Sequence, residues 1–138
     1  MASLIYNSAI DDMARGAIDW DTDSFKAMLV TSAYTPNKDT DLKRSAVTNE
    51  VVGTGYTAGG VASVCTVTKD TANDKVTLAF AAVTWPSSTL TARGCVYYKS
   101  RGGASSADEL VAYNDFGSDV STSGGTFVVA SSVITLQN

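Results

Sequence analysis

Histidine is absent from the 138-residue sequence, and this limits the chemistry open to the protein. Histidine is the commonest general base and the commonest ligand of transition metals in proteins. Ser-His-Asp triads, Cys-His pairs and histidine-based zinc sites are therefore excluded. The G-x-S-x-G signature of a serine nucleophile does not occur either. We predict no catalytic residue, no cofactor and no metal, so we expect a protein that is not an enzyme; the alternative is a hydrolase with a lysine or carboxylate base.

Charged residues are also few, at 17%, and the formal net charge is −4. The Lys and Arg residues are scattered, so the sequence predicts no basic patch for nucleic acid. No apolar run approaches the roughly 18 residues of a membrane span, so we expect no membrane partner. The first residues include Asp11 and Asp12, where a signal peptide would have a basic start and a longer apolar segment. We therefore expect this segment to be part of the fold, and the chain to fold in a cytoplasm.

Only two cysteines are present, Cys65 and Cys95, both in expected strands. In a reducing compartment such residues usually behave as small buried apolar side chains. We predict two free thiols, and a disulfide across paired strands remains the alternative.

The abundant residues are Ser, Thr, Gly and Ala, a composition that suits strands with hydroxyl-rich faces and turns with glycine. A chain of this length is predicted to be one domain, residues 1–138. Apolar residues at helical spacing predict a helix over residues 4–16, with Ser3 as its N-cap and Gly16 closing its last turn. The packing face of this helix is predicted to be Tyr6, Ala9, Ile10, Met13, Ala14 and Ala17.

Short apolar runs separated by turn signals predict a β-domain over residues 24–137. The clearest hairpin joins residues 61–68 to 75–82, and Pro86 must end a strand or lie at a sheet edge. The remaining expected strands are 25–30, 90–99, 110–113, 126–130 and 133–136, with a loop over 114–125. The predicted fold is mainly β: a single-domain β-sandwich or partly open barrel of about seven or eight short strands, with one N-terminal α-helix.

In the run over residues 90–99, strict alternation predicts one inward face, made of Leu90, Ala92, Gly94, Val96 and Tyr98. The aromatic residues Trp20, Trp85, Tyr97 and Tyr98 are predicted to pack in the core, which is the usual position of such side chains. A carbohydrate or protein contact surface is the alternative for these aromatic residues.

Two polar segments are expected to be loops. Residues 39–48 are predicted to form an ordered surface excursion, with Asp41 capping one turn of helix over 42–46. Residues 53–60 match the letters of the G-x-G-x-x-G/A dinucleotide fingerprint, but that site needs a following helix, and the continuation here is typical of a strand. We therefore predict a structural loop rather than a cofactor site.

Three aspartates at alternate positions, Asp19, Asp21 and Asp23, copy the first ligands of an EF-hand calcium loop. The EF-hand fails, because Ser24 replaces the required glycine and Val30 replaces the bidentate glutamate. We predict a solvated acidic turn, and a weaker calcium site completed by a distant loop remains an alternative.

Adjacent carboxylates occur at Asp11 with Asp12 and at Asp108 with Glu109. Only their composition resembles a glycosidase pair, because nothing in the sequence fixes their separation in space. They are predicted to be charges on a helix surface and at the start of a strand.

Several stretches resemble small structural proteins of tailed bacteriophages. These stretches are Tyr6-Asn7-Ser8, residues 16–19 (GAID), Asp23 to Val30 (DSFKAMLV), Tyr34-Thr35-Pro36-Asn37, residues 53–56 (GTGY), Val96 to Lys99 (VYYK) and residues 124–129 (GGTFVV). In that family a helix, an "IDxxxDxxKVxLV" strand and a "YTPNxDT" turn recur in this order. The likeness spans nearly the whole chain, and its motifs are structural.

The resemblance implies a capsid decoration or cement protein, which binds the outer capsid surface of the virion and holds neighbouring major capsid proteins together. It also implies a homo-oligomer, with a trimer favoured, that assembles in the host cytoplasm. The alternative within the same class is a structural or binding module of the tail, baseplate or fibre. Contact with the partner is expected from the N-terminal helix and from polar or Gly-rich loops. The predicted partner-binding residues are Tyr34, Pro36, Asn37, Lys38, Lys43, Arg44 and Tyr56.

Overall fold

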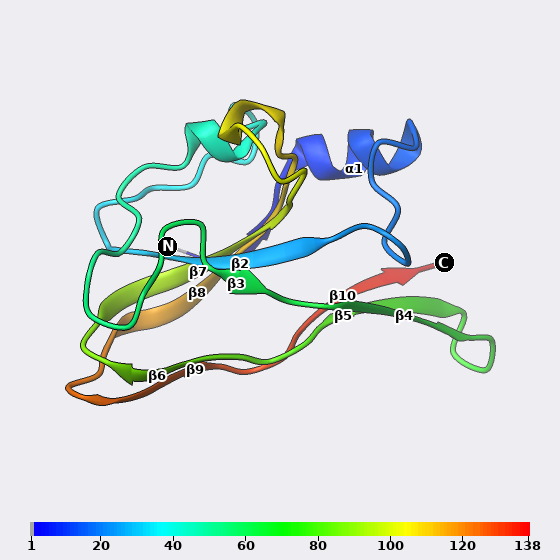
Figure 1. Cartoon of the computed structure of the whole chain (residues 1–138). Helices are drawn as coiled ribbons and strands as arrows, with labels where there is room; N and C mark the ends of the chain where they lie inside the picture. The colour runs from blue at the N-terminus through cyan, green and yellow to red at the C-terminus, as the bar shows by residue number, and fades with distance from the viewer. Residues whose placement is uncertain (1) are drawn as a thin grey trace.

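Two β-layers packed face to face form the body of the protein (Figure 1). The computed structural model describes residues 2–138, which contain ten strands, one α-helix and two short 3-10 helices. The prediction of a mainly β, sandwich-like fold with an N-terminal helix is therefore confirmed. The strand number exceeds the predicted seven or eight partly because two strands have only two residues each.

The first layer is a five-stranded antiparallel sheet with the order β1-β8-β7-β2-β3. It joins distant parts of the chain, because β2 pairs with β7 and β1 pairs with β8. The bounds are β1 Leu4–Ile5, β2 Phe25–Val30, β3 Val61–Ala62, β7 Thr91–Lys99 and β8 Leu110–Ser121.

The second layer consists of a three-stranded sheet, β10-β5-β4, and a two-stranded sheet, β6-β9. Phe80 lies opposite Ser132 and Val83 lies opposite Val129, so one antiparallel register runs through both sheets and they form a continuous bent ribbon. The bounds are β4 Cys65–Asp70, β5 Lys75–Phe80, β6 Val83–Ser88, β9 Gly125–Val129 and β10 Ser132–Gln137. The β4–β5 hairpin was predicted, and Pro86 lies in the short β6-β9 ladder where its register shifts, as an edge position requires.

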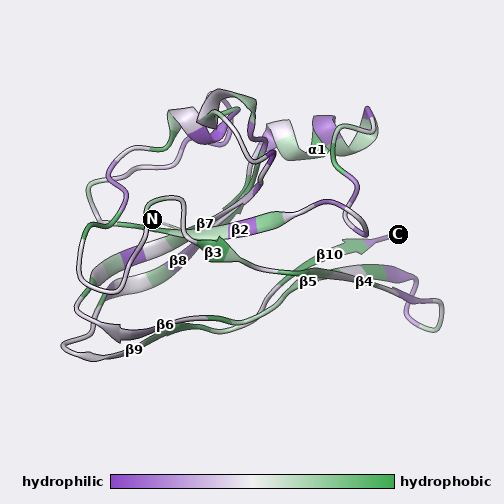
Figure 2. Ribbon diagram, in the orientation of Figure 1, coloured by the Kyte–Doolittle hydropathy of each residue, from purple (hydrophilic) through white to green (hydrophobic). Residues whose placement is uncertain are grey.

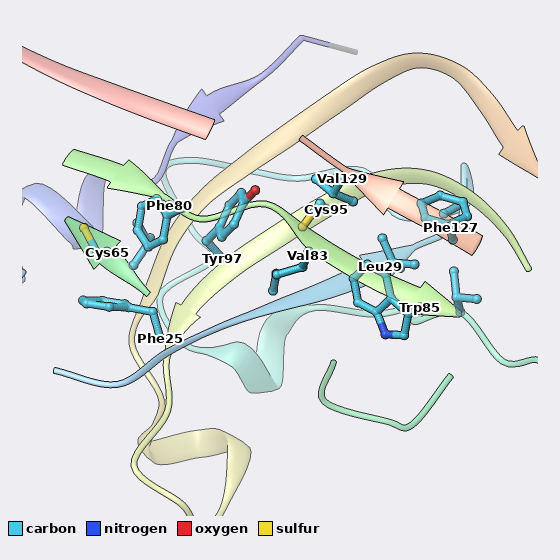
Figure 3. Close-up of a cluster of buried hydrophobic side chains, with 14 of the residues drawn as sticks. Phe25, Leu29, Cys65, Phe80, Val83, Trp85, Cys95, Tyr97, Phe127 and Val129 are labelled. Carbon is cyan, nitrogen blue, oxygen red and sulfur yellow. The ribbon is translucent and has the colours of Figure 1, made fainter. Parts of the chain in front are cut away.

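Aromatic side chains fill the space between the two layers (Figure 3). The ring of Phe80 lies 4.7 Å from that of Tyr97 and 5.5 Å from that of Phe25. Trp85 contacts Phe127 at the other end of the same cluster, with 6.1 Å between ring centroids. Offset and edge-on pairs of this kind each add about 0.5–1.5 kcal/mol beyond the burial of their area. The predicted core position is confirmed for Trp85, Tyr97 and Tyr98, whereas Trp20 is half-buried and packs against this cluster.

The five-stranded sheet is buried on its other face as well. Cys95 and Tyr97 of β7 point into the sandwich, while Val96 and Tyr98 point into a second apolar cluster under the loops. The prediction of one inward face for β7 was therefore wrong. Alternation distinguishes two faces only when one of them is solvated, and here the loops cover the second face.

The N-terminal helix is shorter than the predicted 4–16, because α1 spans Asn7–Ala14 and the residues before it form β1. Ser3 does not cap the helix; its hydroxyl instead accepts a hydrogen bond from the Asp115 backbone N–H at 2.9 Å. Ile10 is 55% exposed, so it does not belong to the packing face. Gly16 follows the helix with a φ of 78°, as predicted for the residue that closes the last turn.

Strand β8 continues through the segment that was predicted to be a loop over residues 114–125. It pairs along β7 as far as Ser121, which lies opposite Thr91. The Gly, Ser and Asp residues of this segment have low strand propensity, but backbone pairing with β7 holds them in a strand. An ion pair of 2.8 Å also joins Arg93 of β7 to Asp115 of β8. Tertiary pairing overrides local composition here.

Gly94 provides a direct test of packing in the sheet. A Cβ atom at this position would overlap the ring of Tyr113, whereas a Cβ at Gly103 would meet no atom within 4 Å. We expect Gly94→Ala to lower the free energy of unfolding by about 1–3 kcal/mol, the usual cost of overpacking. Gly103→Ala, the matched control, should change it by less than about 0.5 kcal/mol. Urea denaturation measures both, and equal stabilities for the two variants would contradict the structure.

The two cysteines are free and buried, as predicted. Burial raises the pKa of Cys65 to about 11 and that of Cys95 to about 12, so neither thiol is ionised at neutral pH. We expect a thiol reagent to label neither cysteine in the folded protein and both in denaturant. Rapid labelling without denaturant would show that the burial is wrong, and no labelling in denaturant without reductant would show a disulfide.

Candidate partner-binding surface

The loops after β2 and before β8 lie over the face of the five-stranded sheet that points away from the second layer, at the top of Figure 1. Helix α1 lies beside these loops, and its buried Ala9 packs in the cluster between the two layers. Figure 2 shows hydrophilic residues gathered in these loops. Beneath them is the second apolar cluster, made of Tyr6, Met28, Val30, Tyr34, Val96, Tyr98, Leu110 and Tyr113. The loops therefore carry a polar outer surface on an apolar base, and four sets of contacts fix them there.

The first set is the turn after β2. The Asn37 side chain accepts hydrogen bonds from the backbone N–H groups of Asp39 at 3.0 Å and Thr40 at 3.3 Å. The Asp41 carboxylate accepts from the Asn37 N–H at 3.0 Å and from the Tyr34 hydroxyl at 2.9 Å. Asp41 thus closes this turn, and the prediction that it caps the following helical turn was wrong: the 3-10 helix η1, Arg44–Ala46, starts after Lys43 and has no side-chain cap.

The second set ties this turn to helix α1. Lys38 accepts a hydrogen bond from the Asn7 backbone N–H through its carbonyl at 3.0 Å, and the Asn7 side chain donates to the Asp39 carboxylate at 2.6 Å. Below them the hydroxyls of Tyr6 and Tyr34 lie 2.8 Å apart. Burial, together with the hydrogen bond to Tyr6, raises the pKa of Tyr34 far above its ordinary value. Tyr34 is only 2% exposed, so this predicted partner-binding residue belongs to the core and holds the loop in place.

The third set is a buried ion-pair network that joins η1 to η2, Ser105–Ala107. Arg44 lies 4.9 Å above the Tyr98 ring and binds Asp108 at 2.8 Å, and the Arg101 backbone N–H donates to the other oxygen of Asp108 at 2.8 Å. Glu109 pairs with Arg101 through two bonds from Nε at 3.0 Å and with Lys43 at 3.4 Å. We call Lys43, Arg44, Arg101, Asp108 and Glu109 the loop ion-pair network.

The two carboxylates of this network were predicted to be charges at the start of a strand. They do lie at the start of β8, but Asp108 is 1% and Glu109 is 3% exposed. The predicted position at the start of a strand is confirmed, and the burial of both carboxylates is a feature that the sequence did not predict. Buried carboxylates require cations, and the cations come from segments far away in sequence, which local patterns do not reveal.

The fourth set fixes the Gly-rich loop over residues 53–60. Glu50 accepts from the Tyr56 hydroxyl at 2.7 Å and from the Gly59 N–H at 2.6 Å, and the Tyr98 hydroxyl donates to the Gly59 carbonyl at 2.5 Å. Gly60 has a φ of 75° and no room for a Cβ against the Ala27 carbonyl. Strand β3 follows the loop where a dinucleotide site would need a helix, so the prediction of a structural loop is confirmed.

The acidic turn before β2 uses its carboxylates internally. Asp19 accepts hydrogen bonds from the N–H groups of Asp21 at 3.0 Å and Thr22 at 3.2 Å, and Asp23 pairs with Lys99 at 2.7 Å. Within the part of the chain that the structure describes, no three His, Cys, Asp or Glu side chains come together as a metal site.

What remains open to a partner is a hollow of about 340 Å³ between α1 and the loop after β2. Its lining is mixed in charge, with a 53% exposed Leu42 as its apolar member. We call this lining, with the adjacent exposed Asn37 and Lys38, the α1–loop surface: Asn7, Ser8, Asp11, Asp12, Asn37, Lys38, Leu42 and Lys43. Such a surface offers hydrogen bonds, charges of both signs and one apolar contact.

The predicted partner-binding residues divide into three groups. Asn37, Lys38 and Lys43 belong to the α1–loop surface, with Pro36 half-buried beside them. Arg44 and Tyr56 are half-buried and act within the loop contacts, and Tyr34 is buried. Leu42 was missed, although an apolar residue inside a polar segment is a recognisable signal.

Comparison of the chain with protein-family models, with curated proteins and with solved structures found no match. No helix within residues 2–138 has the length and apolar character needed to cross a membrane.

The loop ion-pair network predicts a dependence of stability on pH. Burial raises the pKa of Glu109, but the Arg101 hydrogen bonds outweigh it and leave the pKa below its ordinary value of 4.5. The stabilisation from Glu109 is therefore complete above that value and is lost as the pH falls through the folded-state pKa. We expect Glu109→Gln to cost about 1–3 kcal/mol at neutral pH, since Arg101 remains 44% exposed, and to flatten the acid limb of stability.

Urea denaturation between about pH 7 and pH 3 measures this effect. The control is Asp11→Asn, which removes a carboxylate from an exposed pair with Arg15 and should change stability by less than about 0.5 kcal/mol. An unchanged pH profile for Glu109→Gln would contradict the assigned role.

Proposed function

We propose that this protein is a non-enzymatic structural component of a tailed-bacteriophage virion, and that it decorates the outer capsid surface. In this role it binds the lattice of major capsid proteins, as a homo-oligomer, and stabilises contacts between neighbouring capsid proteins. It would be made in the host cytoplasm and function on the virion.

The observation that carries the proposal is the rigid attachment of the α1–loop surface. The stretches that resemble phage structural proteins include β2, the Tyr34–Asn37 turn and residues 53–56, and these build or support the loop-covered face. Their polar groups bind one another and the sheet, so a partner would not have to order these loops on binding. A preorganised surface avoids that entropic cost, which suits repeated contact with identical lattice sites.

The chemistry of this face also fits binding rather than turnover. The carboxylates Asp108 and Glu109 are each engaged by cations, and Glu50 is held by a phenol and a backbone N–H. The exposed groups that remain, among them Lys38 and Leu42, suit contact with another protein surface.

Capsid binding tests the proposal directly. Added to capsids of the encoding phage that were assembled without it, the protein should bind to saturation at a fixed ratio and raise their melting temperature. Two single variants, Lys38→Glu and Leu42→Asp, should each weaken binding by about tenfold or more. Lys69→Glu, an equal charge change on the exposed β4 strand, should leave binding intact.

Failure of the wild-type protein to bind such capsids would overturn the decoration role. Binding that all three variants retain would overturn the α1–loop surface as the contact. Copy number separates the tail, baseplate or fibre alternative, because lattice decoration requires copies by the hundred and a tail position only a few.

A further inference from the structure

The C-terminal strand β10 has one unpaired edge. Its other edge pairs with β5, and among residues 2–138 no strand pairs with its free side. The free side borders an open cleft of about 580 Å³ toward β1, which continues into an apolar hollow of about 130 Å³ under α1. Ile5 and Ile134 line both spaces, so the edge is accessible along the strand.

The hydrogen bonds of the ladder show which backbone groups of β10 are unpaired. Asn138 donates its N–H to the Asp74 carbonyl at 3.1 Å, and in an antiparallel ladder every second residue shares that orientation. The backbone groups of Ser132, Ile134 and Leu136 therefore face β5, and those of Val133, Thr135 and Gln137 face outward. A row of donors and acceptors at alternate residues is what an additional strand requires.

The edge carries none of the devices that usually prevent strand pairing. No charged residue and no proline follows Asp119 in the sequence. In comparison, the opposite edge strand β4 carries Lys69 and Asp70, and the outer part of β8 carries Asp115 and Asp119. Figure 2 shows little hydrophilic character along β9 and β10. An unprotected edge of this kind pairs with another strand unless it is covered.

Apolar side chains are exposed along the same edge. Val133 is 58% exposed and Leu136 is 39% exposed, and nearby Ile5 and Ile10 are 38% and 55% exposed. Residues lining the cleft and the apolar hollow beside β10 are all uncharged. Charged residues, among them Asp74 and Lys75, line only a hollow of about 420 Å³ at the end of the strand, beside Leu136 and Gln137. The occupant of this edge should therefore be an extended, uncharged strand with alternating apolar and hydroxyl residues.

We infer that β10 pairs antiparallel with β10 of a second copy of this chain, so that the three-stranded sheets of two copies become one six-stranded sheet. The sequence Ser-Val-Ile-Thr-Leu-Gln is itself an uncharged strand of the required type. A neutral edge also lets two molecules that each carry a net charge of −4 meet without like charges in contact. This inference does not depend on the proposed capsid role.

The outward backbone groups define the register. Residues that pair through hydrogen bonds must come from the outward set on both strands, and the register that pairs all three of them puts Thr135 on the two-fold axis opposite Thr135 of the second copy. Val133 then lies opposite Gln137, and Ile134 lies opposite Leu136, which joins apolar side chains on the inner face. This register pairs the whole outward set, from Val133 to Gln137.

Cross-linking tests both the pairing and its register. In Thr135→Cys the two Cα atoms should be about 5.5 Å apart, within the range of a disulfide. Mild oxidation should convert the variant into a covalent dimer, and the native cysteines are buried and do not interfere. Thr68→Cys is the matched control. Thr77 of β5 pairs with Thr135 on one side and with Thr68 on the other, so Thr68 is the equivalent threonine on the opposite edge strand, β4. This control should not cross-link.

Sedimentation over a concentration series gives an independent measurement. The wild-type protein should sediment at twice 14.3 kDa, and Thr135→Lys, which places like charges on the axis, should reduce the mass to 14.3 kDa. Thr68→Lys should remain dimeric. Three outcomes would overturn the inference. The wild-type protein could be a monomer at all concentrations, it could be a trimer that Thr135→Cys does not cross-link, or its assembly could be unaffected by Thr135→Lys. Normal capsid binding by a monomeric Thr135→Lys variant would leave the decoration role intact and would show that capsid binding does not require this pairing.

Discussion

The burial of the five-stranded sheet on both faces is the constraint on which the rest of the structure depends. β7 has Cys95 and Tyr97 on one side and Val96 and Tyr98 on the other, and all four are at most 1% exposed. One side is covered by the second layer of the sandwich, which is apolar and aromatic. The other side has only loops to cover it, and those segments are rich in polar and small residues.

A polar loop can cover an apolar sheet only if its own polar groups are satisfied. The loop ion-pair network and the contacts of Glu50 and Asp41 meet this requirement, because they connect the loops to each other while Tyr34 and Tyr98 anchor them to the apolar base. Ion pairs of this kind contribute little net stability, since desolvation offsets much of the attraction, but removing one partner leaves a buried charge. They therefore determine the conformation of the loops more than the stability of the fold.

The parts of the fold that sequence patterns predicted are those in which local and tertiary preferences agree. The β4–β5 hairpin, strand β2 and the left-handed Gly16 each have a local signal that matches their final environment. The continuation of β8 past Asn114 and the short strand β1 have no such signal, because pairing with a distant strand determines both. Of the seven predicted partner-binding residues, Lys43 lines the hollow beside α1, and Asn37 and Lys38 are exposed next to it. The burial of Tyr34 and Asp108 depends on partners that are remote in sequence, and no local pattern contains that information.

The strand order β1-β8-β7-β2-β3 also has a consequence for biosynthesis. The first strands of the chain, β1 and β2, need partners that the ribosome makes only after residue 90. Until β7 emerges, β2 has its largest pairing edge open and its apolar side chains uncovered, and local contacts alone cannot complete the sheet. Chains of this topology fold slowly because they must close long loops before non-local pairing is possible. The nascent protein therefore depends on late synthesis of its C-terminal third, and a truncated product would expose the strand that the finished protein buries most completely.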